Sequence, residues 1–213
     1  MTVTLRSLRA GDEEVAVRWA ADPVFCRAAD WTPGLAPRVV RRHWAAIIAG
    51  GDPAFLRLGV ELDGRLVGFV DLAGLIRTPV ERFAKSFNPS GASGRETGSG
   101  RGVGNPVWFR DVNETNGIRM SGTSAEFGIV IGERALWGRG VARRAGEALI
   151  AHAAGLGLAR LTALVHAPNA RSHALMRRLG FVEAGHAEPQ AYMGEVVPVI
   201  RYEQAIGTDQ PHS

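Results

Sequence analysis

The chain has 213 residues, of which 46% are hydrophobic and 22% are charged, and its formal net charge is +4. These values are typical of a globular protein, and the length suits one sizeable domain spanning 1–213. No apolar run approaches the roughly 18 residues that a membrane helix needs, so we expect no membrane partner. The modest charge is spread along the chain, which argues against a nucleic-acid partner.

The number of cysteines and the N-terminal residues indicate the cellular compartment of the protein. Cys26 is the only cysteine, so no internal disulfide can form. The opening stretch, MTVTLRSLRAGDEE, contains no apolar secretory segment. Both observations predict a cytoplasmic protein.

The first part of the chain predicts a strand, two helices and a hairpin. Residues 3–8 alternate apolar and polar side chains, as a half-buried strand does. Apolar periodicity predicts helices over 11–22 and 37–50, the second with a proline at its start and a glycine at its end. Asp63 and Gly64 separate two apolar runs and form a dipeptide that favours a tight hairpin turn.

A segment rich in glycine and serine follows the hairpin. Residues 88–105, NPSGASGRETGSGRGVGN, contain almost nothing to bury and predict a flexible loop. The GSGRGVG stretch within it looks like a phosphate loop, but Asn105 and Pro106 come next, where a helix would be needed. PVWFRDV, residues 106–112, predicts a short strand. We interpret 78–123 as an insertion into one domain, and not as a linker between two.

The second part of the chain alternates strands with helices. The expected elements are strands at 124–132, 160–167, 180–188 and 195–204 and helices at 138–155 and 169–180. Asn169 is the expected N-cap of the last helix, and Gly180 is expected to end it. The whole order predicts an α/β (α+β) fold with a central mixed, mostly antiparallel sheet that helices flank.

WGRGVA joins a predicted strand to a helix start, which is the context that a phosphate-binding turn needs. Gly138, Gly140 and Ala142 keep the backbone bare, so an anion can approach the amides closely. Arg139, Arg143 and Arg144 add positive charge at the same end of the helix. The alternative is an ordinary loop that enters a helix.

A second motif lies on the helix after the next strand. It comprises Asn169, Ser172, Leu175, Gly180 and Phe181, in the pattern N-x-x-S-x-x-L-x-x-x-x-G-F. Together with WGRGVA, this motif resembles the GNAT N-acetyltransferase superfamily, and in particular the RimJ/RimL-type branch with its ribosomal-protein alanine N-acetyltransferases. The resemblance covers 3–77 and 124–204. The two motifs are specific to the superfamily but not to a substrate.

The resemblance implies one GNAT-fold domain that acts as an acetyl-CoA-dependent N-acetyltransferase without a metal. It would move acetyl directly from acetyl-CoA to a primary amine of a protein N-terminus or of a small molecule. Dimers are common in this branch, so a homodimer is one expected assembly. Trp108 and Phe109 of the insertion are candidates for an acceptor pocket, or belong to a mobile surface loop. The alternative function is a non-catalytic acyl-CoA-binding sensor or interaction module on the same fold.

The resemblance also implies which residues hold coenzyme A. The turn that matches WGRGVA holds the pyrophosphate on backbone amides, which agrees with the anion site expected from the residues alone. Asn169 contacts the pantetheine arm where two strands splay apart, and the strand over 126–131 supplies a backbone N–H to the oxyanion. The expected cofactor-binding residues are Ile129, Val130, Ile131, Trp137, Gly138, Arg139, Gly140, Val141, Ala142, Arg143, Asn169 and Ser172.

Glu126 and Ser172 are the expected catalytic groups. Glu126 is the candidate acceptor of the amine proton, because family members often place a glutamate on this strand; Asp71 and His166 are alternatives. Ser172 is the candidate that protonates or solvates the departing thiolate. Met176 stands where many members carry a tyrosine as general acid, and a thioether donates no proton. This departure leaves Ser172, a water molecule or an unprotonated thiolate, and it keeps the sensor alternative open.

Overall fold

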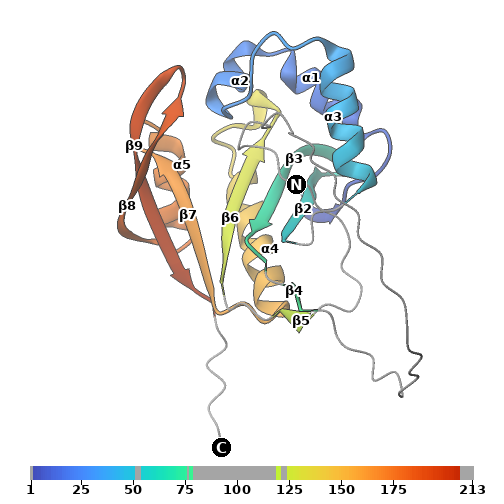
Figure 1. The fold of residues 1–213 in the computed structure, drawn as a ribbon. Coiled ribbons are helices and arrows are strands. Elements are labelled where there is room, and N and C mark those ends of the chain that lie inside the picture. The colour runs from blue at the N-terminus through green and yellow to red at the C-terminus, as the bar shows by residue number, and fades with distance from the viewer. Residues whose placement is uncertain (1, 51–53, 76, 79–118, 121–123, 207–213) are drawn as a thin grey trace, which may run out of the picture.

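A mixed sheet of seven strands forms the centre of the computed structural model, which describes residues 2–50, 54–75, 77–78, 119–120 and 124–206 (Figure 1). The strand order is β1-β2-β3-β6-β7-β9-β8. These strands are β1 (Val3–Ser7), β2 (Phe55–Leu62), β3 (Arg65–Ala73), β6 (Ser124–Ile131), β7 (Arg160–His166), β8 (Val182–Tyr192) and β9 (Glu195–Ala205). Only β6 and β7 pair in parallel, so the expected mixed, mostly antiparallel sheet is confirmed.

Helices cover both faces of the sheet. They are α1 (Asp12–Ala20), α2 (Pro23–Ala28), α3 (Pro37–Ala49), α4 (Val141–Gly155) and α5 (Ala170–Arg178), with a short 3-10 helix η1 (Arg134–Leu136). Side chains alternate between the faces of a strand, so Phe127 of β6 packs with α4 and α5 while Val130 packs with α1, α2 and α3. Among the described helices, none is both long and apolar enough to cross a membrane.

The hairpin between β2 and β3 has the predicted turn. Asp63 and Gly64 both have left-handed backbones, with φ angles of 49° and 82°. Leu62 pairs with Arg65 across this two-residue loop. Two consecutive left-handed residues are the signature of the primed turn that fits the strand twist, so the hairpin prediction is confirmed.

Most predicted elements appear within a few residues of their expected bounds, but α2 does not follow from the apolar pattern. Its signal is local: the Asp22 side chain accepts hydrogen bonds from the amides of Val24 (2.9 Å) and Phe25 (3.3 Å), and Pro23 occupies the first helical position. This is a capped helix start of ordinary chemistry. At the other end of the chain, β8 continues to Tyr192 and so passes the predicted end at residue 188.

The predicted insertion over 78–123 lies almost entirely outside the described residues. So do the strand expected at 106–112 and the pair Trp108 and Phe109. The two flanks that are described form a small antiparallel pair, β4 (Arg77–Thr78) with β5 (Arg119–Met120). These two described flanks therefore lie side by side.

The sheet opens between β6 and β7 (Figure 1). The two strands pair only where Ser124–Glu126 faces Arg160–Thr162, and beyond those residues they diverge. The chain then runs from β6 into α4 and from β7 into α5. Because the strands are parallel, both helices begin at the same end of the sheet, beside the opening. The architecture thus brings the two sequence motifs to one place.

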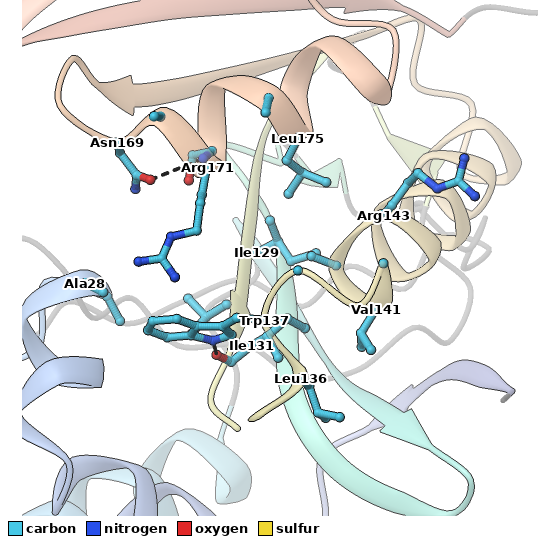
Figure 2. A pocket seen from close by; sticks show the side chains of 18 of the residues that line it. Ala28, Ile129, Ile131, Leu136, Trp137, Val141, Arg143, Asn169, Arg171 and Leu175 are labelled. Carbon is cyan, nitrogen blue, oxygen red and sulfur yellow. Dashed lines mark hydrogen bonds between the residues drawn. The ribbon is translucent and has the colours of Figure 1, made fainter. Parts of the chain in front are cut away.

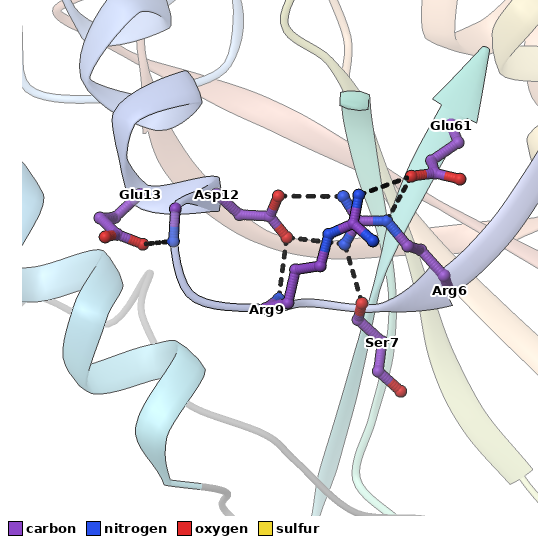
Figure 3. A network of polar contacts seen from close by, with 7 residues as sticks. Arg6, Ser7, Arg9, Asp12, Glu13 and Glu61 are labelled. Atoms are coloured by element: carbon purple, nitrogen blue, oxygen red, sulfur yellow. Dashed lines mark hydrogen bonds and ion pairs between the residues drawn. The ribbon is translucent and has the colours of Figure 1, made fainter. Parts of the chain in front are cut away.

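An arginine network fastens α1 to the edge of the sheet (Figure 3). Arg6 of β1 donates two hydrogen bonds to the Asp12 carboxylate, at 2.7 and 2.9 Å, and a third to Glu61 of β2. Asp12 also accepts from the backbone amide of Arg9 at 2.9 Å. The bonds to Asp12, followed by those to Glu61, raise the pKa of Arg6 although its partial burial opposes them. The first turn of α1 is thereby held beside β1 and β2.

Candidate active site

A cavity of about 470 Å³ lies at the opening between β6 and β7 (Figure 2). Its walls come from α2, β6, the turn before α4, the first turns of α4 and α5, and the end of β8. The predicted cofactor residues that line it are Ile129, Val130, Ile131, Trp137, Gly138, Gly140, Val141, Ala142, Arg143, Asn169 and Ser172. Arg139 and Glu126 are not among the lining residues. One space therefore joins the two motifs.

The start of α4 has the backbone geometry expected of an anion site. Gly138 and Gly140 are left-handed, with φ angles of 75° and 78°, and no other atom would lie within 4 Å of a Cβ added at either. Gly140 is the N-cap and supplies no side chain, so no cap hydrogen bond occupies the first amides of the helix. Those amides carry the positive end of the helix dipole. Arg143 adds its guanidinium at the cavity wall, 3.7 Å from Glu147.

The start of α5 forms the opposite wall. Asn169 is its N-cap, and its Oδ1 accepts a hydrogen bond from the Ser172 amide at 3.2 Å. Gly180 follows the helix with a φ angle of 88°. The predicted cap and end of this helix are therefore confirmed. Asn169 and Ser172 both line the cavity, so capping leaves them at the surface where a ligand would lie.

Trp137 and Arg171 meet in the middle of the cavity (Figure 2). The Trp137 indole donates a hydrogen bond to the carbonyl of Ile131 at 2.8 Å, and the Arg171 guanidinium lies 4.4 Å from the centre of the indole ring. Gly132 donates its amide to Val67 of β3 at 2.9 Å. Backbone groups alternate along a strand, so Ile131 and Ile129 both direct theirs toward the opening. The Ile131 carbonyl has its partner in Trp137, so the groups that face the opening along β6 include the Ile131 N–H and both backbone groups of Ile129.

Glu126 lies at the foot of the opening and is the last residue of β6 that pairs with β7. It pairs with Ala73 of β3 on one side and with Thr162 of β7 on the other. Its side chain keeps an exposed surface, yet the surrounding protein removes enough water to raise the pKa of its carboxyl. A carboxyl with a raised pKa exchanges protons nearer to neutral pH than an ordinary glutamate.

Asp71, the first alternative proton acceptor, is part of a structural ion pair. Its carboxylate accepts from Nε and Nη2 of Arg57, at 2.7 and 3.2 Å. The Arg57 side chain is only 4% exposed, and its guanidinium lies 4.6 Å from the centre of the Phe69 ring. A buried guanidinium needs a counter-charge, so the main role of Asp71 here is to supply one.

His166, the second alternative, ends β7. Its ring stacks on Tyr192, with the ring centres 4.5 Å apart and the planes tilted by 15°. Burial lowers the pKa of His166, while Asp30 and a hydrogen bond with Gln190 oppose that shift. The imidazole is therefore mainly neutral near pH 7, the form that accepts a proton.

Met176 does not face the cavity. It is 3% exposed and packs into the core beneath α5.

Sequence reasoning missed three parts of the cavity wall: the end of α2 with Ala28 and Ala29, the side chain of Arg171, and Tyr192. The capped start of α2 was a readable signal, whereas no motif marks Tyr192. Among the described residues, no three His, Cys, Asp or Glu side chains gather into a metal-binding group.

Comparisons with known proteins agree with this geometry. The model of the acetyltransferase (GNAT) domain family matches residues 2–182. No curated protein matches the sequence significantly. Among solved structures, the spermidine N-acetyltransferase of Vibrio cholerae in complex with CoA and spermine is similar at 20% identity, with a TM-score of 0.63 and coverage of 95% of each chain.

Two further structures show the same fold. A GNAT-family acetyltransferase of Bacillus anthracis is 14% identical, covers 97% of this chain and 96% of its own, and gives a TM-score of 0.63. The aminoglycoside acetyltransferase AAC(6')-Ib in complex with coenzyme A is 12% identical, with coverage of 96% and 95% and a TM-score of 0.60. At these identities the likeness concerns the fold.

Proposed function

The chain belongs to the GNAT acetyltransferases, enzymes that take their acetyl group from acetyl-CoA, and from this premise we propose how its cavity is used. The proposed reaction is direct transfer of acetyl from acetyl-CoA to a primary amine. The amine belongs either to a small molecule or to a protein N-terminus. The RimJ/RimL-type resemblance of the motifs supports the second class of acceptor.

One observation carries the proposal: a single cavity joins the bare start of α4 to the capped start of α5 across the opening in the sheet. The amides after Gly138 and Gly140 suit the pyrophosphate of coenzyme A, because that turn is open and positively charged. Ile129 presents backbone groups to an arm that runs along β6. Asn169 and Ser172 face the same arm from the other wall. Arg139 is exposed and outside the cavity wall, so we assign it a solvent-screened contribution to the phosphates.

In the proposed chemistry, one side chain accepts a proton from the attacking amine and another stabilises the departing thiolate. Glu126 accepts the proton that the amine must lose before it attacks, directly or through water. The N–H groups of Ile129 and Ile131, within the 126–131 strand, face the opening, so we propose one of these two as the oxyanion contact. The Ser172 hydroxyl lines the cavity and stabilises the departing thiolate by a hydrogen bond.

The acceptor class has two sources of support. The similar structures named for spermidine and aminoglycoside acetylation act on small cationic amines, which supports a small-molecule acceptor here. The motif resemblance supports a peptide or protein N-terminus.

The free, buried thiol of Cys26 suits the reducing cytoplasm, where we propose that the protein acts. A homodimer is the assembly that the branch resemblance supports.

The test is thiol release from acetyl-CoA across a panel of amines. The panel contains N-terminal peptides that begin with alanine, polyamines and aminoglycosides, and mass spectrometry then places the acetyl group on the product. Release with one class establishes the reaction and its acceptor together. If CoA binds but no panel member supports thiol release, the chain is a binding module and the proposed reaction is wrong.

A further inference from the structure

Tyr192 brings a phenol to the cavity from outside both motifs. It ends β8, its side chain is 7% exposed, and it lines the same wall as Ala28 and Ala29 of α2. Among the described residues that line the cavity, Tyr192 is the only tyrosine. Tyr192 reaches this wall because β8 ends at the tip of the β8–β9 hairpin, which lies beside α2 (Figure 1).

The surroundings of Tyr192 keep the phenol protonated. Burial raises its pKa, the nearby charge of Asp30 acts in the same direction, and the guanidinium of Arg171 opposes both. Its ring is stacked on the His166 ring at 4.5 Å. His166 stays mainly neutral, because burial lowers its pKa more than Asp30 and Gln190 raise it. The phenol is thus surrounded by one cation, one carboxyl group and one neutral imidazole, and it carries its proton at neutral pH.

The departing sulfur of coenzyme A needs a proton donor. Met176 cannot serve, because a thioether has no proton to donate. A departing alkyl thiolate has a conjugate acid of pKa about 8.5, and a phenol has a pKa of about 10. The two values lie close enough for the proton to move to sulfur as the carbon–sulfur bond breaks. An aliphatic hydroxyl such as that of Ser172 ionises far less readily, so it stabilises the thiolate as a hydrogen-bond donor without giving up its proton.

We propose that Tyr192 is the catalytic residue that protonates the sulfur of coenzyme A, an inference that rests on the proposed acetyl transfer. The amine nitrogen forms the new C–N bond, and the C–S bond breaks with its electron pair on sulfur. Tyr192 gives its phenolic proton to that sulfur. The phenolate then regains a proton, through water, from the amine nitrogen, which must lose one to become an amide. Ser172 keeps the hydrogen-bonding role.

The test compares Tyr192→Phe with two controls. Tyr202→Phe removes the same hydroxyl from β9, where it is 1% exposed and lies 2.8 Å from Nδ1 of His173, outside the cavity wall. Ser172→Ala removes only the proposed hydrogen bond. We expect Tyr192→Phe to lower kcat by about 100-fold with an unchanged Kd for CoA, because a positioned general acid contributes about 10²–10⁴-fold. Tyr202→Phe keeps its kcat, and thermal unfolding confirms that each variant is folded.

A second readout does not depend on turnover. The ionisation of Tyr192 is followed by ultraviolet absorbance as the pH is raised, and the Tyr192→Phe signal is subtracted from that of the wild type. The titration is recorded without ligand, with CoA and with desulfo-CoA. We expect CoA to shift this titration further than desulfo-CoA does, since both ligands bring phosphates and displace water but only CoA places a titrating sulfur beside the phenol. Equal effects of the two ligands, or an undiminished kcat in Tyr192→Phe, would overturn the assignment. A wild type that releases no thiol with any amine would instead overturn the proposed function, while the titration still decides whether Tyr192 faces the sulfur.

Discussion

Glu126 stands at the foot of the opening with a carboxyl that is partly desolvated, and this has a consequence for stability as well as for catalysis. Burial raises the pKa of Glu126 in the folded protein. Protonation of Glu126 therefore stabilises the folded state. This contribution to the free energy of unfolding is fully present below the ordinary glutamate pKa of about 4.3, and it is lost as the pH rises through the raised pKa of the folded protein. At neutral pH the folded enzyme therefore holds a charge in a place that disfavours it.

We predict that Glu126→Gln lowers kcat while it raises thermal stability at about pH 8, where the wild-type carboxylate is charged. Near pH 4 the gain in Tm disappears, since both side chains are then neutral. Glu195→Gln, at an exposed position of β9, is the matched control and changes neither quantity. Scanning calorimetry at the two pH values and thiol release measure the effects. A lower Tm at about pH 8, or an unchanged kcat, contradicts the assignment of Glu126.

Asp71 is predicted to act on stability and not on coenzyme binding. Asp71→Asn leaves the guanidinium of Arg57 buried without its counter-charge, so we expect the free energy of unfolding to fall by about 3 kcal/mol. The double variant Arg57→Met, Asp71→Leu removes both charges and recovers most of that loss. Urea denaturation measures the three free energies. A fully stable Asp71→Asn protein that has lost only kcat would show that Asp71 is the proton acceptor instead.

At the scale of the element, α2 depends on one side chain. Asp22 caps the helix through the amides of Val24 and Phe25, and its other oxygen lies 2.7 Å from Arg134 of η1. The aspartate therefore sets α2 against the turn that leads to α4. Because Ala28 and Ala29 form part of the cavity wall, the position of α2 also shapes the space left for the acceptor.

Two substitutions separate the cap from the ion pair. Asp22→Asn keeps a side-chain oxygen for the cap and loses only a half-exposed ion pair, which is worth at most about 1 kcal/mol. Asp22→Ala loses both, so we expect its free energy of unfolding to lie about 1 kcal/mol below that of Asp22→Asn. We also expect a raised KM for the amine in Asp22→Ala alone. Equal stability of the two variants would mean that the cap does not hold α2.

The elements also show what the sequence predicts and what it does not. Asp63 and Gly64, Asn169, and the glycines before α4 were predictable because each acts on neighbours within a few residues. The short polar helix start at Asp22 was readable but has too few apolar positions to show a period. The stacking of Tyr192 on His166 joins residues that only the sheet topology brings together. Local chemistry therefore predicts the coenzyme end of the site, and tertiary packing determines the rest.

At the scale of the whole molecule, positive charge lines the walls of the cavity that α4 and α5 form. Arg143 comes from the first turn of α4, Arg171 from the first turn of α5 and Arg178 from the end of α5, while α2 contributes small and aromatic side chains. We therefore propose that the phosphates bind at the helix starts and that the amine approaches past α2. The division explains why an enzyme of modest net charge can hold a strongly anionic coenzyme.

We predict that CoA stabilises the folded molecule more than NAD does. A ligand at about 100 times its Kd adds about 2.7 kcal/mol, which raises Tm by roughly 5–10 °C in a protein of this size. NAD carries a pyrophosphate but lacks the pantetheine arm, so it fills only part of the cavity and gives a smaller shift at the same concentration. Thermal unfolding with each ligand decides, and an equal or larger shift with NAD would contradict the cavity assignment.

We propose that the bare turn before α4 holds the pyrophosphate of coenzyme A, and the sharpest measurement of this is a calorimetric titration of CoA. Gly140→Asn and Gly140→Asp place side chains of equal size on the same left-handed residue, where no atom lies within 4 Å of the new Cβ. The two variants share any backbone strain and differ only in charge. We predict that Gly140→Asp binds CoA about 100-fold more weakly than Gly140→Asn, since a carboxylate beside a phosphate is strongly repelled. Equal Kd values for the two variants would show that the pyrophosphate lies elsewhere.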